Sequence, residues 1–378
     1  LDVVAALKGS AFNDVPVYGG RFGLGSKDTV PAHIIAVYNN MVAPQPKPEF
    51  TLSIEDDVTH LSLPVTENPD TTPAGTTSCK FWGLGSDGTV GANKDSIKII
   101  GDNTDMFAQG YFFYDSKKSG GITVSHLRFG SSPITSTYLI NKANFVACHC
   151  PSYVTKYDMV QDLVPGGTFL LNCIWTPDQL DSQLPASMKR YIAENNIHFY
   201  IINGIQIAEE VGLPGRASTI LQSAFFAISG ILPVEKAIEL MKAAVVKKFS
   251  KKGEAVVNAN FAGIDRGAQE IVKVDVPDSW KTAEDAPRRL EVPTDRPEMK
   301  KFVKEILDPV GRLHGDDLPV SAFADRADGV YPAGSAAFEK RGIAITVPQW
   351  DGTKCAQCNL CAMVCPHAVI RPIAMNAE

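Results

Sequence analysis

The fold that we predict rests on one glycine-rich stretch, Gly83-Leu-Gly85-Ser-Asp-Gly88-Thr-Val-Gly91-Ala-Asn-Lys94. It matches the Gly-x-Gly-x-x-Gly fingerprint of dinucleotide-binding turns, although Phe81-Trp82 is a short approach for a first strand of that kind. Asp102 or Asp105 would have to be the acid that binds the ribose. The closely spaced glycines let backbone N–H groups approach an anion, and Lys94 adds charge. We interpret the stretch as a phosphate-binding turn; a tight turn without a ligand is the alternative.

Between Phe145 and Asn203, strand-like segments alternate with helical patterns, which predicts an α/β layer arrangement. The predicted strands are Phe50–Ile54, Ile97–Ile100, Gly110–Tyr114, Gly121–Leu127, Phe145–Ala147, Thr168–Asn172 and Ile343–Val347. The predicted helices are Thr29–Met41 with Asp28 as N-cap, Pro185–Asn195, Arg216–Gly230 and Val234–Lys248.

Two linkers divide the chain into units. Asp70–Thr77 is rich in threonine, proline and glycine, and Val276–Pro297 is rich in proline and charge. A length of 378 residues fits two to three units.

Composition excludes several classes of partner. The net charge is -6 and no block of basic residues occurs, so neither nucleic acid nor an anionic membrane is expected. No apolar run reaches the length of a membrane span. The first residue is Leu1 and no signal peptide pattern follows it, so the start is either processed or part of something longer. We expect a reducing cytoplasmic location, or a hydrogenosome or similar organelle in an anaerobic eukaryote.

Four cysteines near the end form a run, Cys355-Ala-Gln-Cys358-Asn-Leu-Cys361-Ala-Met-Val-Cys365-Pro366. Zinc sites usually pair two separated C-x2-C knuckles, whereas this spacing followed by proline is typical of a bacterial ferredoxin. We predict that Cys355, Cys358 and Cys361 ligate one 4Fe-4S cluster and that Cys365 ligates its neighbour. The other four cysteines are scattered, which is not a disulfide framework.

Other candidate residues have simpler interpretations. Lys117-Lys118 would supply cations to a polyphosphate or would be a solvated hairpin pair. Cys148-His149-Cys150 is interpreted as core, because neighbouring side chains on a strand point to opposite faces. His126 is interpreted as a structural histidine and Lys251-Lys252 as solvent-facing.

Several long motifs together resemble pyruvate:ferredoxin (flavodoxin) oxidoreductases. They are the glycine-rich stretch, Tyr-Asp-Ser-Lys-Lys-Ser-Gly-Gly (114–121), Ser-His-Leu-Arg-Phe-Gly (125–130), Glu339-Lys340-Arg341-Gly342 and the cysteine run, in the family's order. The resemblance covers essentially the whole chain. It implies a multidomain α/β protein: the end of domain II (1–75), a gamma domain with a mixed sheet (76–295), a small irregular domain with the Glu-Lys-Arg signature (296–345), and the start of a ferredoxin-like two-cluster domain (346–378).

The resemblance also implies roles. The family associates its gamma domain with coenzyme A, and the residues carried over to coenzyme A contact are Gly83, Gly85, Ser86, Asp87, Gly88, Thr89, Asn93, Lys94, Lys117 and Lys118. Thiamine diphosphate and magnesium would bind outside this chain, which implies no catalytic residue here and no activity for the fragment alone. The second cysteine run of the family is missing, so the isolated chain is expected to bind iron poorly.

The implied partners are ferredoxin or flavodoxin as electron acceptor, the remaining domains of the enzyme, and a second copy in a homodimer. A module reused in another assembly remains the alternative, as in sulfite reductase subunits with a similar gamma domain or in fusions that pass electrons to NADP. The Glu-Lys-Arg segment running into a ferredoxin motif favours the oxidoreductase.

Overall fold

The computed structural model describes residues 2–22, 27–115, 120–285, 290–339, 348–366 and 368–373. The chain divides into two compact units, Leu1–Arg341 and Gly342–Glu378. Within the residues described, no helix combines the length and apolar character that crossing a bilayer requires.

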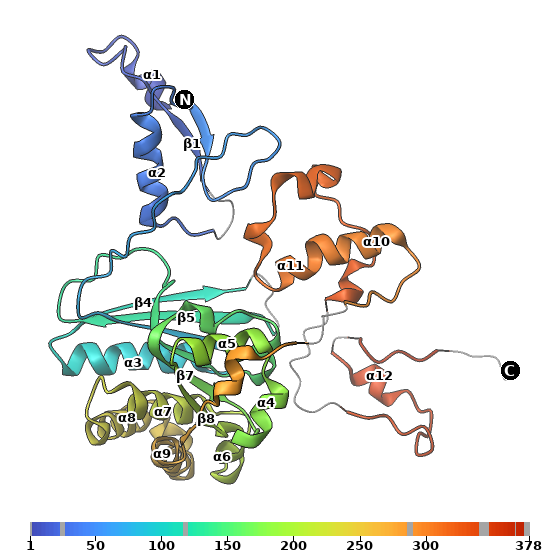
Figure 1. The fold of residues 1–378 in the computed structure, drawn as a ribbon. Coiled ribbons are helices and arrows are strands. Elements are labelled where there is room, and N and C mark those ends of the chain that lie inside the picture. Colours follow the sequence, from blue (N-terminus) through green and yellow to red (C-terminus); the bar gives the residue numbers. More distant parts are fainter. Residues whose placement is uncertain are drawn as a thin grey trace. The chain divides into compact units, whose positions relative to one another are not determined.

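A seven-stranded mixed sheet lies in the first unit (Figure 1). Three parallel pairings, β3–β6, β6–β7 and β7–β8, form its middle, while β5 runs antiparallel to β3 and β4, and β9 antiparallel to β8. In spatial order the strands are β4 (Phe107–Tyr114), β5 (Ile122–Gly130), β3 (Thr77–Leu84), β6 (Ala143–Cys148), β7 (Leu163–Asn172), β8 (His198–Ile202) and β9 (Val272–Lys273).

One face of the sheet shares a hydrophobic core with a layer of helices, seen below the strands in Figure 1. Phe225 is at its centre, with ring centroids 5.0 Å from Phe81 and 5.1 Å from Phe145. The helices are α3 (Thr89–Asn103), α6 (Gly204–Glu210), α7 (Ser218–Ser229), α8 (Val234–Phe249) and α9 (Glu254–Gln269). Two further helices, α4 (Leu180–Gln183) and α5 (Ala186–Glu194), lie between β7 and β8 in the sequence. The Tyr191 hydroxyl of α5 donates to the Leu163 carbonyl of β7 at 2.6 Å.

Strand β4 forms one edge of the sheet. Its aromatic side chains Phe107, Tyr111 and Tyr114 are exposed, and the strand contains no charged residue. Among the residues that the structure describes, β4 pairs only with β5.

Smaller elements flank the sheet in sequence. Before it come α1 (Asp2–Leu7), β1 (Gly19–Arg21), α2 (Pro31–Met41) and β2 (Glu49–Thr51), and after it α10 (Pro297–Phe302) and α11 (Asp308–Gly311), which continue around a π-helical segment, Val303–Leu307. Separate small cores form around Phe50 and Leu52 and around Phe302 and Ile306. In the second unit the one described helix is α12 (Leu360–Val364).

The α/β architecture with a mixed sheet is confirmed, as are the strands predicted around Gly110–Tyr114, Gly121–Leu127, Phe145–Ala147 and Thr168–Asn172. Ile97–Ile100 is wrong as a strand, because it lies inside α3, where Ile99 and Ile100 continue the helical spacing of the buried residues Ala92, Asn93 and Ser96. The approach to the glycine-rich turn is longer than the sequence suggested, since Phe81-Trp82 lies in the eight-residue strand β3.

Three further expectations differ from the structure. Asp28 is not the N-cap of α2, which begins at Pro31; its carboxylate accepts the Leu139 N–H at 2.7 Å. Asp102 lies in α3 and Asp105 just after it, both exposed, so neither follows a strand as the ribose acid of a dinucleotide fold does. The strand predicted at Ile343–Val347 lies outside the described residues.

Candidate functional site

The glycine-rich stretch forms the turn between β3 and α3. Gly88 adopts φ +91° at the start of α3, and a Cβ there would lie 2.6 Å from the Ser218 hydroxyl oxygen of α7. Gly83 is equally crowded, since its Cβ would lie 2.6 Å from the Thr89 hydroxyl oxygen. These glycines let α3 begin directly against the sheet and against α7.

Asp87 holds the turn in shape. One carboxylate oxygen accepts the Leu84 N–H and the other accepts the Thr89 N–H, both at 2.8 Å. The aspartate therefore joins the end of β3 to the first residue of α3.

The β4–β5 hairpin lies against the same turn. The Gly85 N–H donates to the Gly121 carbonyl at 2.7 Å, and the Asp115 N–H donates to the Ile122 carbonyl at 3.0 Å. The described residues on either side of Lys117 and Lys118 are therefore next to the glycine turn, while the two lysines themselves lie outside the described residues.

His149 packs against the first residue of α3. Its ring Nδ1 lies 2.7 Å from the Thr89 hydroxyl oxygen. Its backbone N–H donates to the Trp82 carbonyl, and its backbone carbonyl accepts a hydrogen bond from the Asn172 side-chain amide. Burial lowers the pKa of His149 to about 4, and the Asp87 carboxylate opposes that shift. Cys148 and Cys150 are buried on either side, which confirms the interpretation of these residues as core.

His126 is also structural, as the sequence predicted. It is buried on β5 and its Nδ1 accepts the Ile140 N–H at 3.1 Å. Burial lowers its pKa to about 2, an effect that Lys80 and Arg128 reinforce.

The lowered pKa values of these two histidines predict how acid affects the stability of the first unit. The unfolded chain takes up protons near the ordinary value of 6.5, whereas the folded histidines stay neutral, so stability should fall as the pH drops from 6.5 towards 4. We expect His149→Gln to show a smaller fall than wild type in urea midpoints measured at about pH 7, 6 and 5. The exposed His198→Gln variant is the control; a His149→Gln slope equal to that of wild type would contradict the assignment.

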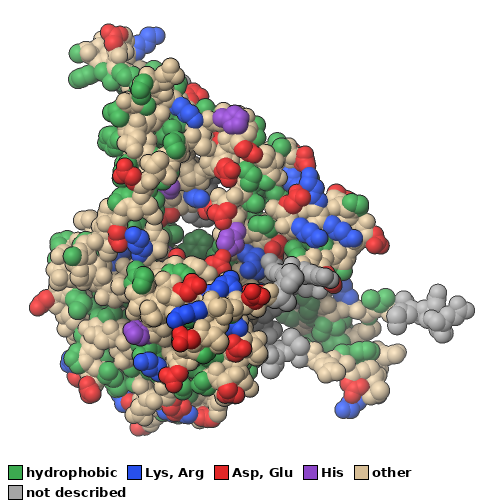
Figure 2. Space-filling model, in the orientation of Figure 1, with side chains coloured by type: hydrophobic (Ala, Val, Ile, Leu, Met, Phe, Trp, Pro, Cys, Tyr) green, Lys and Arg blue, Asp and Glu red, His purple; other side chains and the backbone are tan. Residues whose placement is uncertain are grey.

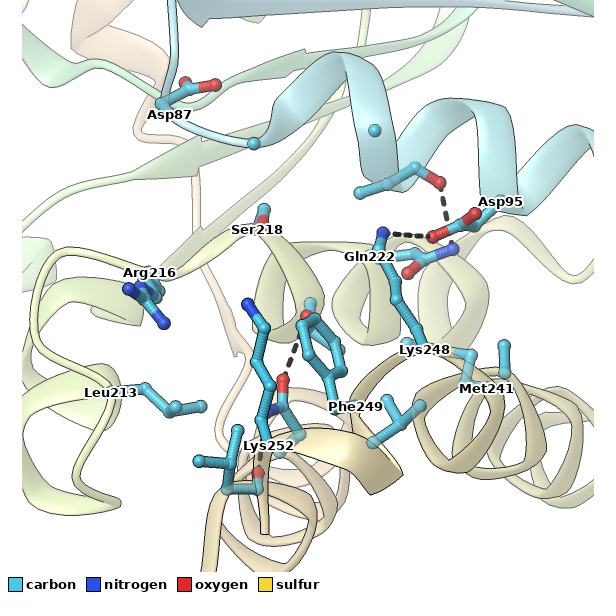
Figure 3. Close-up of a pocket in the computed structure, with 18 of the residues that line it drawn as sticks. Asp87, Asp95, Leu213, Arg216, Ser218, Gln222, Met241, Lys248, Phe249 and Lys252 are labelled. Carbon is cyan, nitrogen blue, oxygen red and sulfur yellow. Dashed lines mark hydrogen bonds and ion pairs between the residues drawn. The ribbon is translucent and has the colours of Figure 1, made fainter.

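A cavity of about 320 Å³ lies between α3, α7, α8 and α9, beside the glycine turn (Figure 3). Ser86, Asp87 and Gly88 line it from the turn. Three cations from later parts of the chain also line it, and none of them was among the predicted contact residues: Arg216, Lys248 and Lys252. The apolar part of its wall includes Ile99, Leu213, Met241, Val245 and Phe249.

At one end of the cavity, charged and polar groups surround an open space. Figure 3 shows Arg216, Ser218 and Lys252 around the space below Asp87, at the end where α3 begins. Helix α7 begins at Ser218, so the N-termini of two helices meet there. Helix N-termini and cations both favour negative charge, so this end of the cavity suits an anion such as a phosphate.

The structure separates the predicted contact residues into three groups. Ser86, Asp87 and Gly88 line the cavity, and Gly85 lies in the same turn. Gly83, Thr89 and Asn93 are buried behind the turn, and the Asn93 amide nitrogen has no hydrogen-bond partner among the described residues. Lys94 is exposed, with its Nζ 5.2 Å from the centre of the Phe112 ring on β4.

Sequence reasoning missed part of the site for a physical reason. Lys251-Lys252 was interpreted as a solvent-facing pair, yet Lys252, although exposed, lines the cavity. Arg216 follows the Pro214-Gly215 break. That break indicates a loop at this point of the chain, but it does not indicate that the next residue binds a ligand. Which distant helices meet at the turn depends on tertiary packing.

The cysteine run lies in the second unit. Cys355, Cys358 and Cys361 are exposed and Cys365 is half-buried. Hydrogen bonds from the Gln357 backbone and the Trp350 side chain lower the pKa of Cys355. Four thiols at this spacing fit the chemistry of a 4Fe-4S cluster, although no three metal-ligating side chains converge among the described residues.

Comparison with known proteins gives three family matches along the chain. A model described as pyruvate ferredoxin/flavodoxin oxidoreductase matches residues 78–270. A domain of unknown function matches residues 285–344, and a 4Fe-4S binding domain matches residues 347–370.

Curated relatives match over nearly the whole chain. A pyruvate-flavodoxin oxidoreductase of Enterobacter agglomerans is 51% identical over 382 residues, covering 100% of this chain and 32% of the relative. A pyruvate:ferredoxin oxidoreductase of Moorella thermoacetica is 52% identical over 359 residues, covering 95% and 30%. A pyruvate dehydrogenase (NADP+) of Cryptosporidium parvum is 43% identical over 401 residues, covering 100% and 21%. The chain thus spans a third or less of the length of these relatives.

Proposed function

This chain belongs to the pyruvate ferredoxin/flavodoxin oxidoreductase family, and we propose that it supplies the coenzyme A-binding domain and the first cluster-binding cysteines of such an enzyme. The complete enzyme would decarboxylate pyruvate with thiamine diphosphate and magnesium bound outside this segment. The proposed domains are 1–75, the gamma domain 76–295, the Glu-Lys-Arg domain 296–345 and the ferredoxin-like start 346–378.

The observation that carries the proposal is the cavity at the start of α3. Its turn, two helix N-termini, Arg216 and Lys252 are all suited to phosphate groups. Coenzyme A carries a pyrophosphate and a phosphomonoester. It therefore needs a phosphate-binding site, but it needs no residues for hydride transfer. The apolar wall at Met241, Val245 and Phe249 gives room for the less polar parts of the ligand.

The proposed contacts combine the sequence and the cavity. Ser86 and Gly88 would present backbone N–H groups to the pyrophosphate, with Arg216 and Lys252 as counter-charges. The N–H groups of Gly85 and Asp87 already donate to the Gly121 and Leu84 carbonyls, so these two residues would contribute by holding the turn in shape. Gly83, Thr89 and Asn93 would act from behind by shaping the turn. Lys94, Lys117 and Lys118 remain proposed contacts.

The cysteine run has the second proposed role. Cys355, Cys358 and Cys361 would hold one 4Fe-4S cluster and Cys365 would ligate a neighbouring one. Such clusters carry single electrons, and ferredoxin or flavodoxin, which the relatives' names mention, would be the acceptor. We also propose a cytoplasmic homodimer.

The relative named for NADP+ supports a second candidate in which the same segment serves an enzyme that passes its electrons to NADP. Both candidates assign the same roles to this segment, and they differ in the acceptor. Reduction of flavodoxin or of NADP+ by the complete enzyme distinguishes them.

Calorimetric titration of coenzyme A into the chain tests the proposal. We expect micromolar-range or weaker binding, and we expect the charge reversals Lys252→Glu, Lys94→Glu and Lys117→Glu each to weaken it, because each replaces an attractive charge by a repulsive one. We expect Lys252→Glu to weaken coenzyme A binding about tenfold, because Lys252 lines the cavity. Lys247→Glu, exposed on α8 and outside the cavity lining, is the matched control. Equal affinities for wild type, Lys252→Glu and Lys94→Glu would count against the site.

A further inference from the structure

An ion pair occupies the end of the cavity away from the glycine turn. Lys248 Nζ of α8 lies 3.1 Å from an Asp95 carboxylate oxygen of α3, and both residues line the cavity (Figure 3). Nearby, the Gln222 amide nitrogen donates to the Ser96 hydroxyl and to the Ala92 carbonyl, and the Ser96 hydroxyl donates to the Ala92 carbonyl, so the donor groups of Gln222 and Ser96 are already engaged within the protein. Lys248 is therefore the cation available to a ligand at this end.

The pair can separate at little cost. The Lys248 side chain is 54% exposed and that of Asp95 36%, and ion pairs in such surroundings contribute little to stability. A phosphomonoester carries nearly two negative charges at neutral pH and offers more acceptor oxygens than one carboxylate. It can therefore take the ammonium group from Asp95, whereas an uncharged hydroxyl cannot.

The cavity presents two ammonium groups to a ligand. Helix α8 ends at Phe249 and Ser250–Lys252 forms a 3-10 turn, and the Nζ atoms of Lys248 and Lys252 lie 5.7 Å and 5.4 Å from the centre of the Phe249 ring. Lys252 lies at the end with Arg216 and Ser218, and Lys248 at the end with Asp95 (Figure 3). A ligand with two phosphate centres would meet one lysine with each.

We propose that Asp95 and Lys248 form an exchangeable pair that makes this cavity selective for ligands with a terminal phosphomonoester. In the free protein Asp95 holds Lys248; in the complex the phosphomonoester binds Lys248 in its place. Asp95 then remains near the bound phosphomonoester, and the repulsion between the two negative charges lowers the affinity for the ligand. The inference rests on the proposed function, because the ligand tested is coenzyme A.

The test compares coenzyme A with 3′-dephospho-coenzyme A by calorimetric titration of the whole chain. Lys248→Gln should weaken coenzyme A binding about tenfold and change 3′-dephospho-coenzyme A binding by less than about twofold. Asp95→Asn should tighten coenzyme A binding about threefold, more at low salt than at high salt. Lys247→Gln on α8 and Asp102→Asn on α3, both exposed and outside the cavity lining, are matched controls and should leave both affinities unchanged.

The outcomes separate the inference from the function on which it rests. If Lys248→Gln weakens both ligands equally, or if Asp95→Asn does not tighten coenzyme A binding, the exchangeable pair is refuted while the binding site stands. If wild type binds neither ligand, the proposed function fails and the inference fails with it. Because Lys248 and Asp95 are both partly exposed, neither substitution opens the core, so unfolding does not blur the result.

Discussion

Replacing Cys358 by alanine in the complete enzyme should remove one low-potential electron-paramagnetic signal after anaerobic reconstitution. A 4Fe-4S cluster is held by four thiolates, and Cys358 is the middle member of the three that we predict share one cluster. Alanine offers no ligand, so we also expect the loss of about four iron atoms per chain. Iron analysis and the spectrum of the dithionite-reduced protein measure the two effects.

The matched control for Cys358→Ala is Cys150→Ala. Cys150 lies outside the run, in the interior beside β6, where its sulfur is 3.3 Å from the Ser152 hydroxyl oxygen. It should keep the full iron content and every signal. An unchanged spectrum and iron content for Cys358→Ala would show that Cys358 is not a ligand.

Phe225→Ala should lower the free energy of unfolding of the first unit by about 3–5 kcal/mol. Phe225 is 1% exposed and contacts the rings of Phe81, Phe145 and Phe226, so its removal leaves a cavity between α7 and the sheet. Urea denaturation followed by tryptophan fluorescence measures the loss, because Trp82 and Trp280 are buried in this unit.

Phe107→Ala provides the comparison for Phe225→Ala. Phe107 is 48% exposed on the edge strand β4, so its truncation removes far fewer contacts and should cost less than about 1 kcal/mol. Equal losses for the two variants would mean that the aromatic cluster around Phe225 is not the centre of the core.

Much of the fold followed from local pattern. The parallel strands carry short apolar runs and the helices begin after Pro-Gly or Pro signals, as at α7 and α8, so those elements were predictable. The strand prediction at Ile97–Ile100 is wrong because a four-residue Ile-Lys-Ile-Ile segment is too short to distinguish a strand from a helix. The helical period becomes visible only when the buried positions Asn93 and Ser96 are included.

The candidate site likewise has one part that the sequence predicts and one part that it does not. The turn Gly83–Gly88 is contiguous, and its glycine spacing together with Lys94 favoured an anion site over a simple tight turn. Arg216 and Lys252 are contributed by chain more than a hundred residues later, brought to the turn by the packing of α7, α8 and α9. No local pattern in those segments marks a binding residue, so the cations of the cavity required the structure.

The edge strand β4 has a consequence for handling the isolated segment. It offers eight uncharged residues, with three exposed aromatic rings and an edge that pairs with no second strand among the described residues. Such an edge is a template on which another copy can add a strand, and natural sheets avoid this by charge, proline or cover. Without cover, the segment should self-associate through β4 as its concentration rises, so its solubility depends on what shields that edge.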